Sequence, residues 1–278
     1  MQRIKNKIFD GERALYGVDS VYLSNCRFDG PADGESALKE CNNIKTERCL
    51  FNLRYPFWHD NKVDILECKM TSMCRAPLWY SKEITAIESI LHGPKALREC
   101  SNVFIRQCDV DSVEFGWSSS DVKMLSSSAK GEYFMLRAKN LYFRDVRFTG
   151  KYSFQYIENA VFENCIFDTK DAFWHAKNVV VKNSSVKGEY LSWYSENVTF
   201  ENCVISGTQP LCYCKGLRLI DCEMHEADLA FELSEVEATL STPMISIKNP
   251  LHGKIYVPEV QELIRDNADS ACEIIFTA

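Results

Sequence analysis

Acidic and imidazole side chains recur along the chain at places where they could act on a sugar. Hydrolysis of a glycosidic bond uses two carboxyl groups roughly 5 to 10 Å apart, and Asp171 and Glu189 are the pair that we expect to meet this spacing. His175 is a further candidate for acid–base work, because an imidazole titrates near neutral pH. These three residues form the predicted catalytic set, and they suit a glycoside hydrolase or a polysaccharide lyase.

A series of aromatic and polar residues supplies the predicted binding surface. Tyrosine and histidine combine an apolar ring with a hydrogen-bonding tip, which suits the two kinds of face on a sugar ring. Arginines add the cation that a uronate substrate of a lyase needs. The predicted binding residues are His59, Tyr80, Arg98, Glu99, Arg137, Tyr156, Tyr194 and Tyr213.

The thirteen cysteines could indicate disulfides or a metal. Their odd number, in a sequence whose start lacks the apolar core of a secretion signal, favours free thiols in a reducing cytoplasm. Cys212 and Cys214 form a C-x-C pair, but no second pair with metal-ligand spacing follows, so we expect no metal site. The sequence also contains no glycine-rich phosphate loop and no nucleophile elbow, and we therefore expect no cofactor.

The cysteines recur because a nine-residue unit recurs. With φ for an apolar residue, it reads N-V-x-φ-x-N-C-x-φ, as in 197–205, and related copies occupy 159–167 and 102–110. Eight of the ten steps along its cysteine position are 19 residues, and the one step of 23 places an insertion within 29–34. The position is occupied by Cys26, Cys49, Cys68, Ser89, Cys108, Ser127, Val146, Cys165, Ser184, Cys203 and Cys222.

The pattern of apolar and polar residues within the nine-residue unit indicates β-structure. Val198 and Phe200 alternate with polar Thr199 and Glu201, which is the two-residue period of a strand. A repeat of this length then predicts coils that stack as parallel strands about 4.8 Å apart. We predict an all-β fold, a right-handed single-stranded parallel β-helix (β-solenoid) of about twelve coils.

The solenoid is expected to form one domain over residues 1–278. Residues 1–19 would cap its start, 20–243 would form the repeating coils, and 244–278 would add C-terminal coils and a cap. Within the last segment, VPEVQELIRD suggests a short helix around 260–264, and 273–276 suggests a final strand.

Columns of residues 19 apart acquire distinct roles in such a fold. We expect the cysteine position to point inward as a ladder of small side chains, with Asn or Asp at the preceding corner in left-handed conformation. Strand alternation would place the five tryptophans inside. The tyrosine and histidine positions would face water in steps of about 4.8 Å, and glycines at 30, 93, 131, 150, 188 and 207 would form turns.

The net charge and the hydropathy limit the classes of partner that we expect this protein to bind. The net charge of −7 offers no field for nucleic acid, and no apolar run approaches the ~18 residues of a membrane span. We therefore expect a cytoplasmic protein that binds neither nucleic acid nor membrane.

Several blocks of the sequence carry a resemblance to a known family. FDGERALYG (9–17), GESALKEC (34–41), LRYPFWH (53–59), TQPLCYC (208–214) and DLAFE (228–232) resemble DUF3737, a bacterial family of unknown function. The resemblance implies a right-handed β-helix, a fold similar to that of pectate lyases and polygalacturonases, and it implies no activity or catalytic residues. The spaced aspartate signatures of those enzymes are not matched here, and fold alone does not confer their function.

Two functional hypotheses follow. The first is a β-helix that binds or processes a carbohydrate along its aromatic strip. The second is a non-catalytic scaffold whose same face packs against a partner or forms a homodimer. The second would be favoured if Phe57, Leu78, Phe154, Phe173 and Leu211 formed an exposed column, because contiguous apolar patches mark interfaces.

Overall fold

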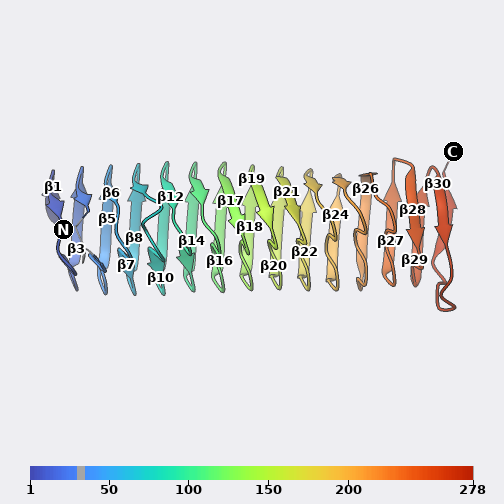
Figure 1. The fold of residues 1–278 in the computed structure, drawn as a ribbon, viewed down its shortest axis with the longest axis horizontal. Helices are drawn as coiled ribbons and strands as arrows, with labels where there is room; N and C mark the ends of the chain where they lie inside the picture. Colours follow the sequence, from blue (N-terminus) through green and yellow to red (C-terminus); the bar gives the residue numbers. More distant parts are fainter. Residues whose placement is uncertain (30–34, 278) are drawn as a thin grey trace. The chain divides into compact units, whose positions relative to one another are not determined.

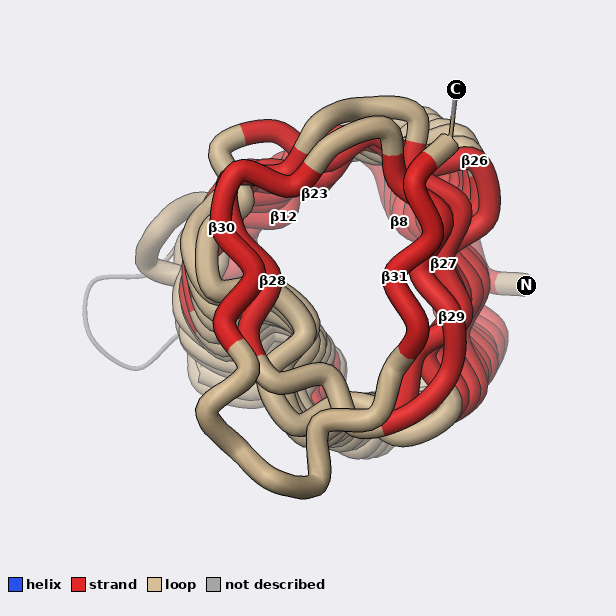
Figure 2. Tube along the Cα trace, turned by 90° about the vertical axis from the view of Figure 1, so that its right-hand side faces the viewer, coloured by secondary structure: helices blue, strands red, loops and turns tan. Residues whose placement is uncertain are grey.

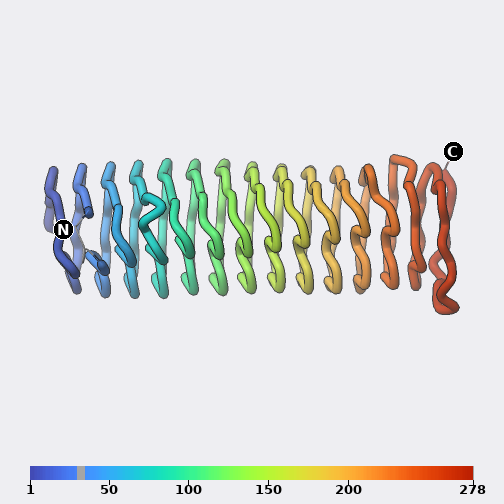
Figure 3. The backbone as a smooth tube through the Cα atoms, viewed as in Figure 1, coloured from blue at the N-terminus to red at the C-terminus, as the bar shows by residue number. Residues whose placement is uncertain are grey.

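The computed structural model describes residues 1–29 and 35–277 (Figure 1; Figure 3). The chain divides into two compact units, unit 1 (1–142) and unit 2 (143–277). Most of the insertion predicted within 29–34 therefore lies outside the described residues. The described part of the chain is all-β and contains no helix. It accordingly holds no helix that could cross a membrane.

Unit 1 is a stack of coils whose strands pair in parallel with the strands one coil on. One sheet joins β1, β3, β5, β8, β11, β14 and β16, a second joins β2, β4, β6, β9, β12, β15 and β17, and a short third sheet joins β7, β10 and β13. The strands are β1 (Gln2–Lys5), β2 (Ile8–Phe9), β3 (Asp19–Ser24), β4 (Arg27–Phe28), β5 (Asn42–Glu47), β6 (Leu50–Phe51), β7 (Phe57–Trp58), β8 (Asn61–Leu66), β9 (Lys69–Met70), β10 (Leu78–Trp79), β11 (Lys82–Ile87), β12 (Ile90–His92), β13 (Leu97–Arg98), β14 (Ser101–Arg106), β15 (Asp109–Asp111), β16 (Ser120–Leu125) and β17 (Ser128–Glu132).

Unit 2 repeats this architecture after β18 (Lys139–Arg144), which spans the boundary between the units. Its first sheet runs through β20, β22, β24, β26, β27, β29 and β31, its second through β19, β21, β23, β25 and β26, and β28 pairs with β30. The strands are β19 (Arg147–Lys151), β20 (Glu158–Glu163), β21 (Ile166–Lys170), β22 (Lys177–Lys182), β23 (Ser185–Lys187), β24 (Glu196–Glu201), β25 (Val204–Ser206), β26 (Leu217–His225), β27 (Glu235–Leu240), β28 (Met244–Lys248), β29 (His252–Val257), β30 (Val260–Ile264) and β31 (Glu273–Phe276).

The β-solenoid and its 19-residue spacing are confirmed, but the predicted number of coils was low. The two units together contain about fourteen turns rather than twelve. Residues 1–19 account for part of the difference, because β1 pairs with β3 and β2 with β4, so this segment is itself a coil. Residues 1–9 carry the nine-residue unit only in a weak form, with Asn6 at the corner but Lys7 at the cysteine position, so the repeat count missed it.

The helix predicted around 260–264 is wrong. Residues Val260–Ile264 form β30, which pairs in parallel with β28, while the predicted last strand is confirmed as β31, paired with β29. Figure 2 shows β28 and β30 on one side of the coil and β29 and β31 on the other. The apolar residues Val260, Leu263 and Ile264 have helical spacing, but the free edge of β28 offers a full set of backbone partners, and tertiary pairing overrides this local pattern.

The cysteine column is a continuous interior file within each unit, as predicted. Its members are buried, and so are all thirteen cysteines, whose thiols are free. The corners before it are left-handed as predicted at Asn and Asp, with φ of 53° at Asn164 and 50° at Asn202, but Arg48, Glu67 and Gln107 take the same conformation, with φ of 49°, 51° and 53°. Corner and column together turn the chain at the same place in every coil, which keeps residues 19 apart in register.

The tryptophans do not lie inside, contrary to the prediction. Phe57, Leu78 and Phe173, which directly precede Trp58, Trp79 and Trp174, are buried, whereas the tryptophans are half-buried on the outside. The segment before each tryptophan is a series of tight turns with left-handed residues at alternate positions, such as Asp171, Phe173 and His175 with φ of 54°, 61° and 55°. Strand alternation does not hold in such a backbone, so the inward position shifts by one.

Candidate functional site

The tyrosines and histidine predicted to face water form a stacked ladder in unit 2. Ring centroids lie 4.8 Å apart for Tyr156 and His175, 5.1 Å for His175 and Tyr194, and 4.7 Å for Tyr194 and Tyr213, with 11° to 14° between neighbouring planes. Backbone bonds align the coils here, since the Tyr156 amide donates to the carbonyl of Trp174 at 2.8 Å. The geometry of the predicted ladder is therefore confirmed.

The stacking decides what the ladder offers to a ligand. Each inner ring has both faces against its neighbours, so sugar rings cannot stack on those faces. Tyr194, an inner ring, is nevertheless 46% exposed, and because both of its faces are covered by stacking, this exposure is along the ring edge and hydroxyl. At the end of the ladder the Tyr213 hydroxyl donates to Glu232 at 3.4 Å, and burial, helped by the Glu232 charge, raises the pKa of Tyr213 to about 12. The ladder therefore presents hydrogen-bonding groups rather than aromatic planes.

The predicted binding residues of unit 1 form a smaller stack and an ion-pair network. His59 and Tyr80 stack at 4.9 Å. The guanidinium of Arg98 lies 4.7 Å from the ring centre of Trp117 and is paired with Glu99 at 3.2 Å and Glu114 at 3.3 Å. Its charge is thus already compensated within the fold. Arg137, the remaining predicted binding residue of unit 1, is exposed.

The predicted catalytic residues are not brought together around one cavity. His175 is stacked in the ladder between two tyrosines. Asp171 is 6% exposed, its backbone carbonyl accepts a hydrogen bond from Gln155 at 2.8 Å, and burial raises the pKa of its carboxyl group. Glu189 alone lines the cavity described next, where Lys170 pairs with it at 2.7 Å.

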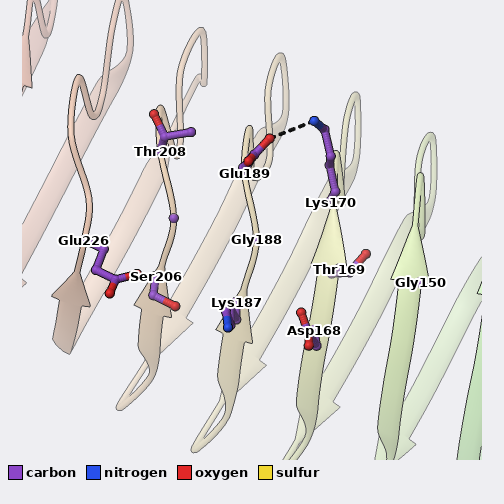
Figure 4. Close-up of a pocket in the computed structure, with 11 residues that line it drawn as sticks. Gly150, Asp168, Thr169, Lys170, Lys187, Gly188, Glu189, Ser206, Thr208 and Glu226 are labelled. Atoms are coloured by element: carbon purple, nitrogen blue, oxygen red, sulfur yellow. Dashed lines mark hydrogen bonds and ion pairs between the residues drawn. The ribbon is translucent and has the colours of Figure 1, made fainter.

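A cavity of about 430 Å³ lies at the carboxyl ends of β19, β21, β23 and β25, and we call it the groove (Figure 4). Its floor is made by small residues 19 apart: Gly150, Thr169, Gly188 and Gly207. Gly188 has φ of 152°, and a Cβ atom there would lie 1.4 Å from the carbonyl oxygen of Thr169. Successive coils approach so closely at this point that only glycine fits, and the missing side chains leave the hollow.

Two rows of polar side chains border the floor. The strand register aligns Asp168, Lys187, Ser206 and His225 in successive coils. On the other side, the groove is lined by Lys170, Glu189 and Thr208 (Figure 4). Glycines spaced 19 residues apart mark the floor of the groove in the sequence. From the sequence they are predicted only to form turns, because the residues next to each glycine do not show that stacked turns leave a cavity.

Aromatic contacts connect the groove with the ladder. Lys170 Nζ lies 5.2 Å from the ring centre of Tyr190, whose ring meets Trp193 edge-on at 5.2 Å. Trp193 in turn meets the ladder ring of Tyr213 at 5.3 Å, and its indole N–H donates to the carbonyl of Gln209 at 2.7 Å. Groove and ladder therefore belong to one connected surface of unit 2.

Metal ligation and thiol chemistry have little support in the described residues. No group of three or more His, Cys, Asp or Glu side chains that could hold a metal ion occurs among them. Burial raises the pKa of the Cys100 thiol to about 12 and of the Cys165 thiol to about 11, so both stay protonated at neutral pH.

A family model described as "Protein of unknown function (DUF3737)" matches residues 2–275. No curated protein matches the sequence. Three similar solved structures are PfbA, a surface adhesin of Streptococcus pneumoniae (10% identity, 91% of this chain and 71% of that one, TM-score 0.41), the A-module of the Azotobacter vinelandii mannuronan C-5 epimerase AlgE4 (12%, 99% and 89%, 0.36), and the tailspike protein of the E. coli bacteriophage HK620 (10%, 98% and 74%, 0.40). These likenesses are too remote to argue for a function.

Proposed function

The chain belongs to the DUF3737 family, whose description assigns no activity, and we propose from the geometry of unit 2 that the protein binds a carbohydrate in the groove and along the adjoining ladder. The observation that carries the proposal is the groove itself. Its volume lies within the ~300–1,000 Å³ of small-molecule sites, and it is lined by ammonium, carboxylate and hydroxyl groups. Such groups donate to and accept from sugar hydroxyls.

The ladder extends this polar surface beyond the groove. Sugars meet the hydroxyl tips and ring edges of Tyr156, Tyr194 and Tyr213, because the ring faces are occupied by stacking. Of the catalytic set, Glu189 with its partner Lys170 serves in this proposal as a ligand for sugar hydroxyls, while Asp171 and His175 support the surface from outside the groove.

The alternative, a scaffold that self-associates through the same face, lacks the feature that would favour it. Phe57, Leu78, Phe154, Phe173 and Leu211 are all 1% exposed or less. Together they form core and not an apolar patch that a second copy could cover.

A glycan screen monitored by tryptophan fluorescence tests the proposal, because Trp174 and Trp193 adjoin the surface. We expect at least one polysaccharide to change the emission, and Lys170→Met to weaken its binding about ten-fold, the loss of roughly one charge-assisted hydrogen bond. Tyr194→Ala should also weaken it, whereas Tyr80→Ala, at the matched stack of unit 1, should not. Light scattering that shows a dimer, with no glycan response, would support the scaffold instead.

A further inference from the structure

A serine on the border of the groove has a histidine on one side and a lysine on the other. The register pairs Ser206 with His225 of the next coil and with Lys187 of the preceding coil. Parallel strands lie about 4.8 Å apart, so both neighbours stand one strand spacing from the serine. The residues before them, Val186, Ile205 and Met224, are buried, so all three side chains point outward on one face.

The histidine is held by a carboxylate. His225 Nε2 lies 2.9 Å from Glu223 Oε2, two residues earlier on the same strand. A carboxylate at this distance fixes the proton on Nε2 and leaves Nδ1 as the acceptor. About half of each of the two side chains is exposed, so the imidazole lies at the surface on the same face as Ser206.

The lysine supplies a free positive charge. Lys187 is exposed and lines the groove, and among the described residues it has no carboxylate within ion-pair distance. Lys170, by contrast, is paired with Glu189 at 2.7 Å. An unpaired ammonium beside a hydroxyl can stabilise negative charge that develops on a reacting carbonyl oxygen.

We propose that these residues form an ester-hydrolysing site, in which Ser206 is the nucleophile, His225 the general base, Glu223 its positioning residue and Lys187 the stabiliser of the oxyanion. The ester is an O-acyl group on the bound carbohydrate, a choice that rests on the function proposed above. The proposal requires one contact beyond those described above, a hydrogen bond that the Ser206 hydroxyl donates to Nδ1 of His225. Hydrogen bonds of this kind are often long in unliganded sites and shorten when substrate enters.

The reaction balances without a cofactor. Ser206 Oγ forms a bond to the acyl carbon and gives its proton to His225, which passes the proton to the departing sugar oxygen as the ester C–O bond breaks. Water then attacks the acyl-serine and gives one proton to His225. His225 passes this proton to Ser206 Oγ as the bond between Oγ and the acyl carbon breaks, which releases the carboxylic acid and restores both residues. Gly207 and Thr208, next along the chain, line the groove, so a sugar held there brings its acyl group to the serine (Figure 4).

A fluorophosphonate probe tests the site without a known substrate, because it phosphonylates an activated serine and releases fluoride. We expect the intact protein to be labelled, with the label located on Ser206 by peptide mass spectrometry. Ser206→Ala should abolish this label, and His225→Gln should slow labelling by about 10²-fold, the usual contribution of a general base. Lys187→Met should slow it too, and Lys187→Arg, which keeps the charge, should restore part of the rate.

The matched control is His92→Gln in unit 1, where His92 Nε2 has the same 2.9 Å contact with a carboxylate, that of Asp109. It should leave the rate at Ser206 unchanged. Near-ultraviolet circular dichroism identifies any variant that fails to fold. An unlabelled Ser206 in the folded protein, or an unchanged rate in folded His225→Gln, would overturn the proposal. Glycan binding without labelling defeats only this inference, and labelling of Ser206 without glycan binding defeats only the carbohydrate proposal.

Discussion

At the scale of single residues, the cysteine column does more than fill space. Each serine in it accepts a hydrogen bond from the amide of the residue one coil earlier, as Ser184 does from Cys165 at 2.9 Å, and donates to the carbonyl two residues back, Lys182, at 2.6 Å. Thiols act in the same way, since Cys68 accepts from the Cys49 amide at 3.3 Å. Corner amides that strand pairing cannot satisfy are satisfied by side chains, so the column selects small residues that both donate and accept.

A second column of small buried residues runs through Cys41, Ser81, Cys100 and Ser119, and Asp60 is the exception in it. Its Oδ1 accepts from the Cys41 amide at 2.8 Å, its Oδ2 is buried without a partner, and its amide donates to Ser81 at 3.1 Å. Burial raises the pKa of this carboxyl group to about 8. Because the unfolded value is about 4, unit 1 should be most stable below pH 4 with respect to this group and should lose stability as the pH rises through 8, by on the order of 5 kcal/mol in total.

The variant Asp60→Ser places at this position a serine hydroxyl, which both donates and accepts hydrogen bonds, as at other positions of the column. Urea unfolding followed at pH 6 and pH 9 should show a smaller difference in unfolding free energy for this variant than for the natural chain. Glu40, whose charge also acts on Asp60, provides the control: Glu40→Gln should keep most of the pH dependence. Equal pH dependence in Asp60→Ser and the natural chain would refute this account.

At the scale of elements, the coil is the unit of folding and its corners are the points of control. Parallel strands recur because corner residues turn left-handed at fixed places, and the groove exists because one corner column is small, with Gly150, Gly188 and Gly207 beside Thr169. Gly207 repeats the arrangement of Gly188, since its φ is 129° and a Cβ atom would lie 2.2 Å from the Gly188 carbonyl oxygen. The same feature therefore serves both the stacking of coils and the shape of the candidate site.

Gly188→Ala tests this dual role. The added methyl group must push the Thr169 carbonyl away and strains a left-handed backbone, so we expect a loss of about 1–3 kcal/mol in unfolding free energy and a lower melting temperature. Gly11→Ala, where a Cβ atom would meet nothing within 4 Å, is the matched control and should change little. If the two variants had the same melting temperature, the close approach of coils at Gly188 would not be required for stability.

At the scale of the whole molecule, the protein carries all of its thirteen thiols in the interior of its two units. Burial raises the pKa of the Cys212 thiol to about 12 and of the Cys214 thiol to about 11, so neither is the reactive thiolate at neutral pH. The thiols are thus structural in both units, and their number gives a measure of how completely the chain is folded.

Titration with a thiol reagent makes this measurable. We expect almost no reaction of the native protein with Ellman's reagent at pH 8 and reaction of all thirteen thiols in guanidinium. The reaction rate in intermediate denaturant should follow unfolding detected by circular dichroism. Rapid reaction of several thiols in the native protein would contradict the buried columns.

Much of the fold was readable from the sequence because a solenoid is periodic. Contacts join residues 19 apart, so the spacing of Cys165, Ser184, Cys203 and Cys222 in the chain is also their order in space. The ladder of Tyr156, His175, Tyr194 and Tyr213 followed from the same rule. The prediction failed where periodicity was missing or misleading: at the first coil, at β30, and at the tryptophans, whose turn backbone does not alternate like a strand.

The sequence by itself determined the β-solenoid, its register and the outward-facing ladder, because these depend on the repeat alone. Only the tertiary structure decided that the ladder rings cover one another, that Asp171 is buried, and that a column of small residues leaves a groove lined by Lys187 and Ser206. Those features depend on how closely neighbouring coils approach and on which side chains point the same way, and distances of this kind are set by packing across coils rather than by order along the chain.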